Sequence, residues 1–124
     1  SEVINMFEQV SESTVYGVEI PGTEGRAGMV SMVLNVDLDK FKLDEFLKFI
    51  KADLSAYAVP RFIRIQKEME ITGTFKHRKV ELKKEGYNPS KIKDPLFVLL
   101  PKSNKYEPIT KKIYDEIQKG DHRF

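Results

Sequence analysis

The stretch MVSMVLNVDLDKFKLDEFLKFIKADL, residues 29–54, decides the fold, because a strongly apolar strand pattern is followed by the clearest amphipathic helix of the chain. Residues 29–36 are apolar enough for a buried central strand. In residues 43–54, apolar side chains recur at helical spacing and lysine and glutamate fill the other side, which predicts a helix. A buried strand followed by such a helix indicates a sheet with helices packed on it.

The flanking sequence carries shorter signals of both kinds. Helical spacing predicts an opening helix over residues 3–10 that Ser11, Glu12 and Ser13 break, and glycines after two further periodic runs predict helix ends at Gly86 and Gly120. The remaining elements that we expect are strands over 16–20, 62–65 and 96–100 and helices over 76–85 and 109–117. This order predicts an α+β fold, with a small mixed or antiparallel sheet covered by helices.

Length and composition describe one soluble globular domain over residues 1–124. The chain has 124 residues, 40% of them hydrophobic and 32% charged, and contains no internal repeat or domain linker. No apolar run approaches the roughly 20 residues that a membrane-spanning helix needs. The absence of cysteine excludes disulfides, zinc-finger ligation and thiol nucleophiles, and two histidines argue against a histidine-rich metal site.

Positive charge is concentrated in the middle of the chain. The net charge is only +2, but residues 60–93 contain ten Lys or Arg against four Glu. Such a segment suits an anionic partner such as a phosphate ester, a nucleic acid or an acidic lipid headgroup. A solvated basic face without a partner explains the same charges, and composition leaves both interpretations open.

Histidine and the acidic pairs give no catalytic arrangement. His77 stands among Lys76, Arg78 and Lys79, which disfavour its protonation, and no neighbouring carboxylate orients it as a base. Adjacent carboxylates at 44–45 and 115–116 point about 100° apart on a helix, so they do not converge on a substrate. No Ser-His-Asp set or phosphate-loop motif is present.

The loop over residues 72–76 is the strongest candidate site. Gly73 permits a sharp turn, Thr72 and Thr74 supply hydroxyls, and Lys76 stands at the start of a predicted helix, where the helix dipole disfavours a cation. An anionic ligand there would meet amide N–H groups, the dipole and the ammonium together. The alternative is an ordinary exposed lysine.

The motifs around this loop resemble those of one enzyme family. The chain is similar to the C-terminal domain of the fatty acid transport protein and very-long-chain acyl-CoA synthetase family, a branch of the adenylate-forming ligases. The motifs that carry the resemblance are VYGV (15–18), PGTEGRAGM (21–29), LSAYAVPRFIRI (54–65), EITGTFKHRK (70–79), EGYNP (85–89) and DPLF (94–97). They cover nearly the whole chain. We therefore expect the chain to be a fragment cut before Ser1, without the large N-terminal adenylation domain and inactive alone.

The resemblance implies a reaction and a set of site residues. Such a ligase converts a long- or very-long-chain fatty acid, ATP and CoA into acyl-CoA, AMP and pyrophosphate through an acyl-adenylate. The resemblance also implies that Lys76 is the catalytic lysine of adenylation and that Thr74 and Lys79 bind ATP or the acyl-adenylate. Most adenylate-forming ligases have glycine and arginine where Phe75 and Lys79 stand, a departure that the fatty acid transport branch shares. Arg26 is a candidate CoA contact, with a structural role in its glycine-flanked loop equally open.

The resemblance also implies partners and a compartment. We expect ATP and CoA as substrates, Mg²⁺ in the missing N-terminal domain, no metal and no nucleic acid on this chain, and a location in the cytoplasm or on the cytoplasmic face of a membrane. The partner of this domain would be its own N-terminal adenylation domain. The alternative function is a non-catalytic basic module that binds acidic membrane or nucleic acid through residues 60–93.

Overall fold

The computed structural model describes residues 2–21, 26–54, 58–67, 82–100, 103 and 105–121. Its strands are β1 (Val10–Glu19), β2 (Arg26–Leu34), β3 (Phe62–Gln66), β4 (Leu96–Leu99) and β5 (Tyr106–Pro108). Its helices with defined bounds are α1 (Glu2–Asn5), the 3₁₀ helix η1 (Leu38–Lys40), α2 (Leu43–Asp53) and α4 (Lys111–Lys119). Residues 82–85 are also helical.

The five strands form one open mixed sheet in the order β1-β2-β3-β4-β5. Only β2 and β3 run parallel, and the chain between them passes through α2, as a parallel connection requires. The other neighbouring pairs are antiparallel. The predicted α+β fold with a mixed sheet is therefore confirmed.

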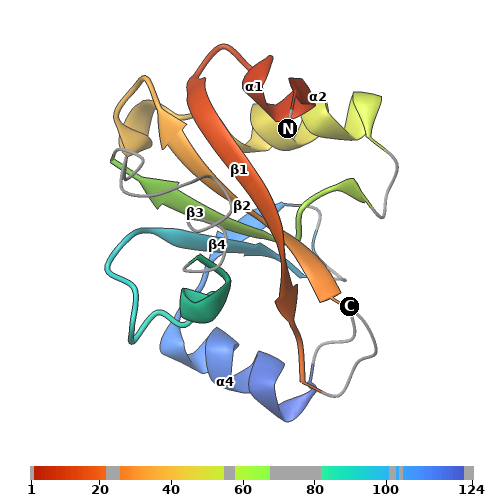
Figure 1. Cartoon of the computed structure of the whole chain (residues 1–124), viewed down its shortest axis with the longest axis vertical. Coiled ribbons are helices and arrows are strands. Elements are labelled where there is room, and N and C mark those ends of the chain that lie inside the picture. The colour runs from red at the N-terminus through yellow and green to blue at the C-terminus, as the bar shows by residue number, and fades with distance from the viewer. Residues whose placement is uncertain are drawn as a thin grey trace.

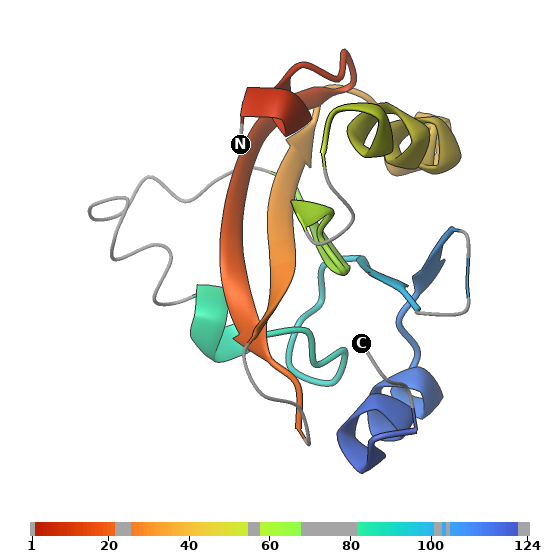
Figure 2. The ribbon, with the colours of Figure 1, turned by 90° about the vertical axis from the view of Figure 1, so that its right-hand side faces the viewer.

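Helices cover both sides of the sheet. In Figure 1, α1 and α2 lie above the sheet and α4 lies below it. Figure 2 shows α2 on one side of β1 and β2 and the helical residues 82–85 on the other. The sheet thus separates two hydrophobic cores, and in the described part of the chain no helix is both long and apolar enough to cross a bilayer.

The first core lies under α1 and α2. The apolar side of α2 buries Phe46, Leu47 and Ile50 against alternate residues of β2 and β3. Phe46 is fully buried, and its ring centroid lies 5.3 Å from that of Phe7 and 5.7 Å from that of Phe41. The helical spacing of the sequence thus turns directly into one apolar layer.

The second core lies under α4 and the segment after residue 82. Phe62 of β3 is fully buried, and its ring stacks on Tyr87 with centroids 4.1 Å apart. Ile117 of α4 is also fully buried in this core. Gly86 and Gly120 follow their helices with φ of 59° and 82°, which confirms the predicted left-handed helix ends.

The sequence misplaces the end of one element and misses another. The opening helix stops at Asn5, and residues 10–13 belong to β1, because the tertiary pairing with β2 satisfies their backbone groups. Helical spacing of Val3, Phe7 and Val10 was a chance match over a short window. Strand β5 has no counterpart in the predicted elements, since three residues ending in Pro108 carry too little periodicity to signal a strand.

Candidate functional site

One row of polar side chains crosses the sheet on the side of the second core. Thr14, Ser31 and Arg64 are the buried polar or charged residues among those described, exposed by 3%, 0% and 7%. They are direct neighbours across β1, β2 and β3, because Thr14 pairs with Ser31 and Ser31 pairs with Arg64. Cross-strand partners point to the same side of a sheet, so the three residues form one polar row.

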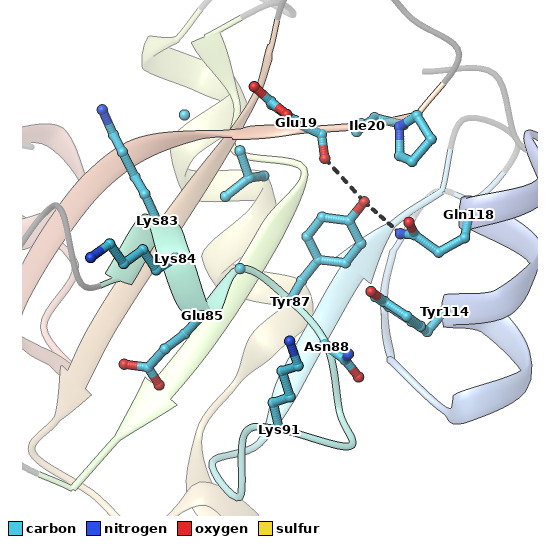
Figure 3. A pocket seen from close by; sticks show the side chains of 14 residues that line it. Glu19, Ile20, Lys83, Lys84, Glu85, Tyr87, Asn88, Lys91, Tyr114 and Gln118 are labelled. Carbon is cyan, nitrogen blue, oxygen red and sulfur yellow. Dashed lines mark hydrogen bonds between the residues drawn. The ribbon is translucent and has the colours of Figure 1, made fainter.

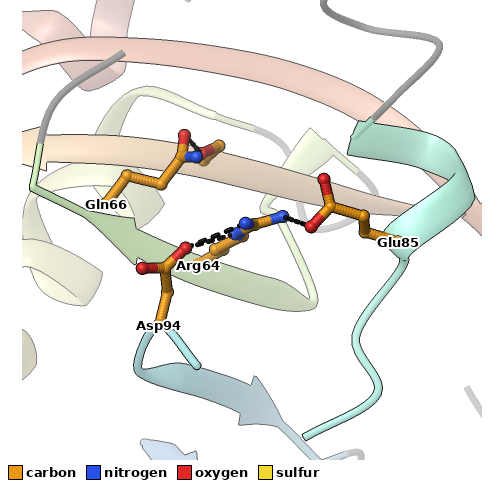
Figure 4. A network of polar contacts seen from close by, with 5 residues as sticks. Arg64, Gln66, Glu85 and Asp94 are labelled. Carbon is orange, nitrogen blue, oxygen red and sulfur yellow. Dashed lines mark hydrogen bonds and ion pairs between the residues drawn. The ribbon is translucent and has the colours of Figure 1, made fainter. Parts of the chain in front are cut away.

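Arg64 is the centre of this row and holds two carboxylates (Figure 4). Its Nε and Nη2 lie 2.9 Å and 2.8 Å from Asp94 Oδ2. Its Nη1 lies 3.0 Å from Glu85 Oε2, as an ion pair without hydrogen-bond geometry. The side chains of Glu85 and Asp94 are 42% and 31% exposed, so a buried guanidinium is neutralised by two carboxylates that reach the surface.

The two ends of the segment that contains the candidate loop lie beside this row. Lys67 directly follows β3, and Leu82 begins the helical residues 82–85. Arg64 lies on β3 and Glu85 on the helical residues, so their ion pair joins the two ends. At the β3 end, the Ser31 hydroxyl donates a hydrogen bond to Gln66 Oε1.

The predicted site residues lie outside this described geometry. Thr74, Lys76 and Lys79 fall in residues 68–81, which are not among the described residues, and the predicted helix over 76–85 is described only from residue 82. Arg26 is the first residue of β2, and its backbone pairs with Glu19 of β1. The roles given to these four residues therefore stay predictions.

A pocket of about 740 Å³ lies next to the helical residues 82–85, between the end of β1 and α4. The Tyr87 hydroxyl donates to the Glu19 carbonyl at 3.2 Å and accepts from Gln118 Nε2 at 3.1 Å (Figure 3). Lys83, Lys84 and Lys91 line the pocket together with Glu19 and Glu85. Three lysines against two glutamates leave the charge of the lining close to balanced, so charge alone does not select an occupant.

Burial raises the pKa of two tyrosines near the site. Burial raises the pKa of Tyr16 above the ordinary value of 10.0, while Arg64 acts in the opposite direction and Glu85 adds to the rise. The Tyr16 hydroxyl is buried and has no hydrogen-bond partner among the described residues. Burial also raises the pKa of Tyr87, so both hydroxyls stay protonated at neutral pH.

Sequence reasoning missed the network of Arg64. In the sequence, Arg64 is one charge of the basic middle segment and part of the motif at 54–65, and Asp94 is part of the motif at 94–97, with nothing that pairs the two. The available signal was a charged residue inside the apolar strand pattern Phe62-Ile63-Arg64-Ile65, because a buried arginine needs a carboxylate partner. The carboxylates that pair with Arg64 lie about 20 to 30 residues further along the chain, and only the fold brings them to the arginine.

Metal chemistry has no assembled ligand set in the part of the chain that the structure describes. In those ranges, no three His, Asp or Glu side chains come together to hold an ion.

Comparison with known proteins links the chain to one family. The family of AMP-binding enzyme C-terminal domains matches residues 2–76. The chain is 44% identical over 123 residues to long-chain fatty acid transport protein 6 of Homo sapiens and 44% identical over 117 residues to long-chain fatty acid transport protein 2 of Rattus norvegicus. These alignments cover 98% and 94% of the chain but 19% of each relative, so the chain spans about a fifth of the length of the curated relatives it matches.

Proposed function

The chain belongs to the family of AMP-binding enzyme C-terminal domains, and from this membership we propose that it is the C-terminal lid domain of a long- or very-long-chain fatty acid–CoA ligase. In this proposal it works against a large N-terminal adenylation domain. The curated relatives are named long-chain fatty acid transport proteins, which supports fatty acids as the substrate class.

The observation that carries the proposal is the extent of the family match. It runs from residue 2 to residue 76, so it includes α2 and β3 and ends on Lys76. The same lysine is the residue to which the sequence resemblance assigns adenylation. The match therefore extends as far as Lys76, the side chain to which this proposal assigns the adenylation step.

In the first half-reaction, a carboxylate oxygen of the fatty acid attacks the α-phosphorus of ATP. An oxygen–phosphorus bond forms, the bond to the bridging oxygen breaks, and pyrophosphate leaves with the electron pair. Two anions must meet in this step, and the ammonium of Lys76 lies between carboxylate and phosphate oxygens. It lowers the barrier by positioning both and by stabilising the charge that they share in the transition state.

In the second half-reaction, the sulfur of CoA attacks the acyl carbon of the adenylate and its thiol proton passes to solvent. A carbon–sulfur bond forms, the bond from the acyl carbon to the phosphate oxygen breaks, and AMP leaves with the electron pair. Lys76 has no task in this step, and the domain turns it away before the thiol arrives. Thr74 and Lys79 assist with ATP or the acyl-adenylate, and Arg26 contacts CoA. Mg²⁺ belongs to the adenylation domain, and the whole ligase acts in the cytoplasm or on the cytoplasmic face of a membrane.

The decisive experiment separates the two half-reactions in the longer protein that contains this domain. Lys76→Ala is expected to slow pyrophosphate release about 100- to 1000-fold, the usual cost of removing one preorganised charge-stabilising donor. Thioester formation from synthetic acyl-adenylate and CoA is expected to stay near normal. Lys48→Ala, on the exposed side of α2, is the matched control and should change neither step. Unchanged pyrophosphate release in Lys76→Ala would remove this residue from the mechanism.

A basic binding module is the competing proposal. Lys67, Lys83, Lys84 and Lys91 are exposed in the described part of the basic segment, which gives it a surface for anions. Binding of the 124-residue chain to anionic vesicles and to DNA at physiological salt tests it. Strong binding that weakens steeply with added salt would favour the module, whereas weak binding would favour the ligase.

A further inference from the structure

We propose that an apolar patch over α1 and α2, formed by Val3, Met6, Phe7 and Phe49, is the surface against which the large adenylation domain of the same protein docks. The part of that domain that meets the patch is apolar and bordered by lysine or arginine. The identity of the partner rests on the proposed function, whereas the patch itself rests on described residues alone.

Met6 is the most exposed member of this patch. It follows α1 directly, its N–H donates to the Val3 carbonyl at 3.1 Å, and the residue is 69% exposed. A flexible thioether adapts to the surface that it meets, which suits methionine to protein-binding surfaces. One exposed apolar side chain needs no partner to explain it, so the argument depends on what surrounds Met6.

Three half-buried side chains extend the apolar surface around Met6. Val3, Phe7 and Phe49 pack against the first core and keep part of their surface exposed. The ring centroids of Phe7 and Phe49 lie 5.4 Å apart, and α1 lies against α2 (Figure 1). The apolar surface therefore continues from the end of α1 to α2. Partly exposed aromatic rings of this kind are typical anchors of protein interfaces.

Carboxylates border the patch. Glu45 and Asp53 are exposed and lie four residues on either side of Phe49, which places them on the same side of α2. Glu8, in the turn after α1, is also exposed. Lys42 is the lysine at helical spacing from Phe49, two turns away, and the other lysines of α2 lie one or two residues from Phe49 and point to other sides. An acidic border attracts a basic protein surface and is repelled by an anionic membrane.

The location of the patch favours the rest of the same protein as its occupant. The chain matches a family of C-terminal domains and covers 19% of relatives such as long-chain fatty acid transport protein 6, so in a protein of that length a much larger part precedes it. That part connects to the domain at α1, whose four residues span about 6 Å. A short connection holds two parts at a high effective concentration. The patch beside it therefore meets this partner before any free protein.

Photo-crosslinking in the longer protein identifies what covers the patch. The photoreactive residue p-benzoylphenylalanine replaces Met6 in one variant and Leu38, the other exposed large hydrophobic residue among those described, in the matched control. Mass spectrometry then locates the crosslinked peptides. The probe at position 6 is expected to crosslink to an apolar and basic peptide of the adenylation domain in the same chain, and the probe at position 38 is not. Crosslinks from position 6 to a second copy or to lipid, or none at all, would overturn the proposal.

Limited proteolysis measures how often the patch is docked, because cleavage between the two parts follows the undocked population when docking is faster than cleavage. Met6→Ser is expected to raise the cleavage rate about 10- to 100-fold, the effect of leaving one methionine side chain in water. Leu38→Ser is the matched control and should leave the rate unchanged. Since Met6 is 69% exposed, Met6→Ser should keep the circular dichroism spectrum of the parent protein, which excludes unfolding as the cause.

Reversal of one border charge tests the chemistry of the partner. Glu45→Lys places an ammonium against a basic surface and is expected to raise the cleavage rate about 2- to 10-fold, as the loss and reversal of one exposed charge pair predicts. Lys48→Glu, on another side of α2, is the control and should leave the rate unchanged. A rate that falls in Glu45→Lys would mean that the partner surface is acidic and would contradict the proposal.

The outcomes separate this surface from the ligase chemistry. If Lys76→Ala slows pyrophosphate release but Met6→Ser leaves cleavage unchanged, the docking surface fails while the proposed function stands. If Lys76→Ala has no effect but position 6 crosslinks to the preceding part of the same chain, the docking surface stands and the ligase chemistry fails. Equal increases of cleavage in Met6→Ser and Leu38→Ser would also overturn the docking surface.

Discussion

The two sides of the sheet bury different kinds of side chain. The side under α1 and α2 buries a continuous apolar layer in which Phe7, Phe41 and Phe46 meet edge to face or tilted. The side under α4 is apolar over only part of its area, and its remainder is the polar row that ends at Arg64. A hydrophobic layer needs volume and shape, whereas a buried polar row needs specific partners at fixed distances.

This difference separates stability from positioning. Apolar burial is non-directional and scales with area, so the side under α2 supplies free energy of folding without specifying one contact. A buried ion pair, such as those of Arg64, contributes little net stability but fixes which side chains meet and at what distance. We therefore expect variants of buried residues on the first side to act on stability alone, and variants on the second side to separate stability from geometry.

The largest effect is expected in the first core. Phe46→Ala should lower the free energy of unfolding by about 3–5 kcal/mol, because a fully buried ring is lost and a cavity remains. Urea unfolding of the 124-residue chain measures this. Phe49→Ala, a half-buried neighbour on the same helix, should lose about 1–2 kcal/mol. Equal losses in the two variants would contradict the view that this layer is a close-packed core.

A smaller loss of stability is expected at Arg64, where two substitutions of different size separate packing from charge. Arg64→Ala should cost about 3 kcal/mol, because it leaves a void where a buried side chain stood. Arg64→Met should stay within about 1 kcal/mol of the parent chain, because it refills most of that volume and the two carboxylates, 42% and 31% exposed, remain hydrated. Urea unfolding of both variants measures the difference. A large loss in Arg64→Met would mean that the charges themselves stabilise this side.

The two sides of the sheet each bury a tyrosine, so the stability contribution of one hydroxyl can be compared between them. The Tyr106 hydroxyl, in the first core, donates to the Pro60 carbonyl at 2.6 Å, whereas the Tyr16 hydroxyl lacks a hydrogen-bond partner among the residues described. Tyr106→Phe should therefore cost about 1–2 kcal/mol, because a buried carbonyl loses its donor. Tyr16→Phe should be neutral or slightly stabilising. Thermal unfolding of the two variants side by side tests this, and a loss in Tyr16→Phe would reveal a partner for its hydroxyl.

The smallest effect concerns how the two covering helices begin. The Thr110 side chain accepts a hydrogen bond from the Ile113 N–H at the start of α4. Lys42 occupies the equivalent N-cap position of α2, and its side chain makes no capping hydrogen bond. Thr110→Ala should cost about 1 kcal/mol of stability, and Lys42→Ala less than about 0.5 kcal/mol. Circular dichroism during thermal unfolding measures both. Equal costs would mean that burial alone holds α4.

The elements with long, regular patterns were predictable from the sequence. The helix over residues 43–54 is α2, and the strands expected over 29–36, 62–65 and 96–100 are β2, β3 and β4 with ends shifted by at most three residues. A helical pattern that rests on only three apolar residues was not reliable, as Val10 shows: it fitted a helix and starts a strand. Of the candidate site, the sequence indicated Lys76 and its loop, which lie outside the described residues and stay a prediction.

The sequence by itself determined the α+β class, the first core and the family, because periodic burial and motif order are properties of neighbouring residues. Only the tertiary structure decided which charges meet. Arg64 lies 21 residues before Glu85 and 30 residues before Asp94 in the sequence, and the choice of these two carboxylates depends on the register of β3 with β4 and on the turn at Gly86. Local patterns hold no information on such distant pairs. A buried arginine predicts that carboxylates are needed, and the fold selects them.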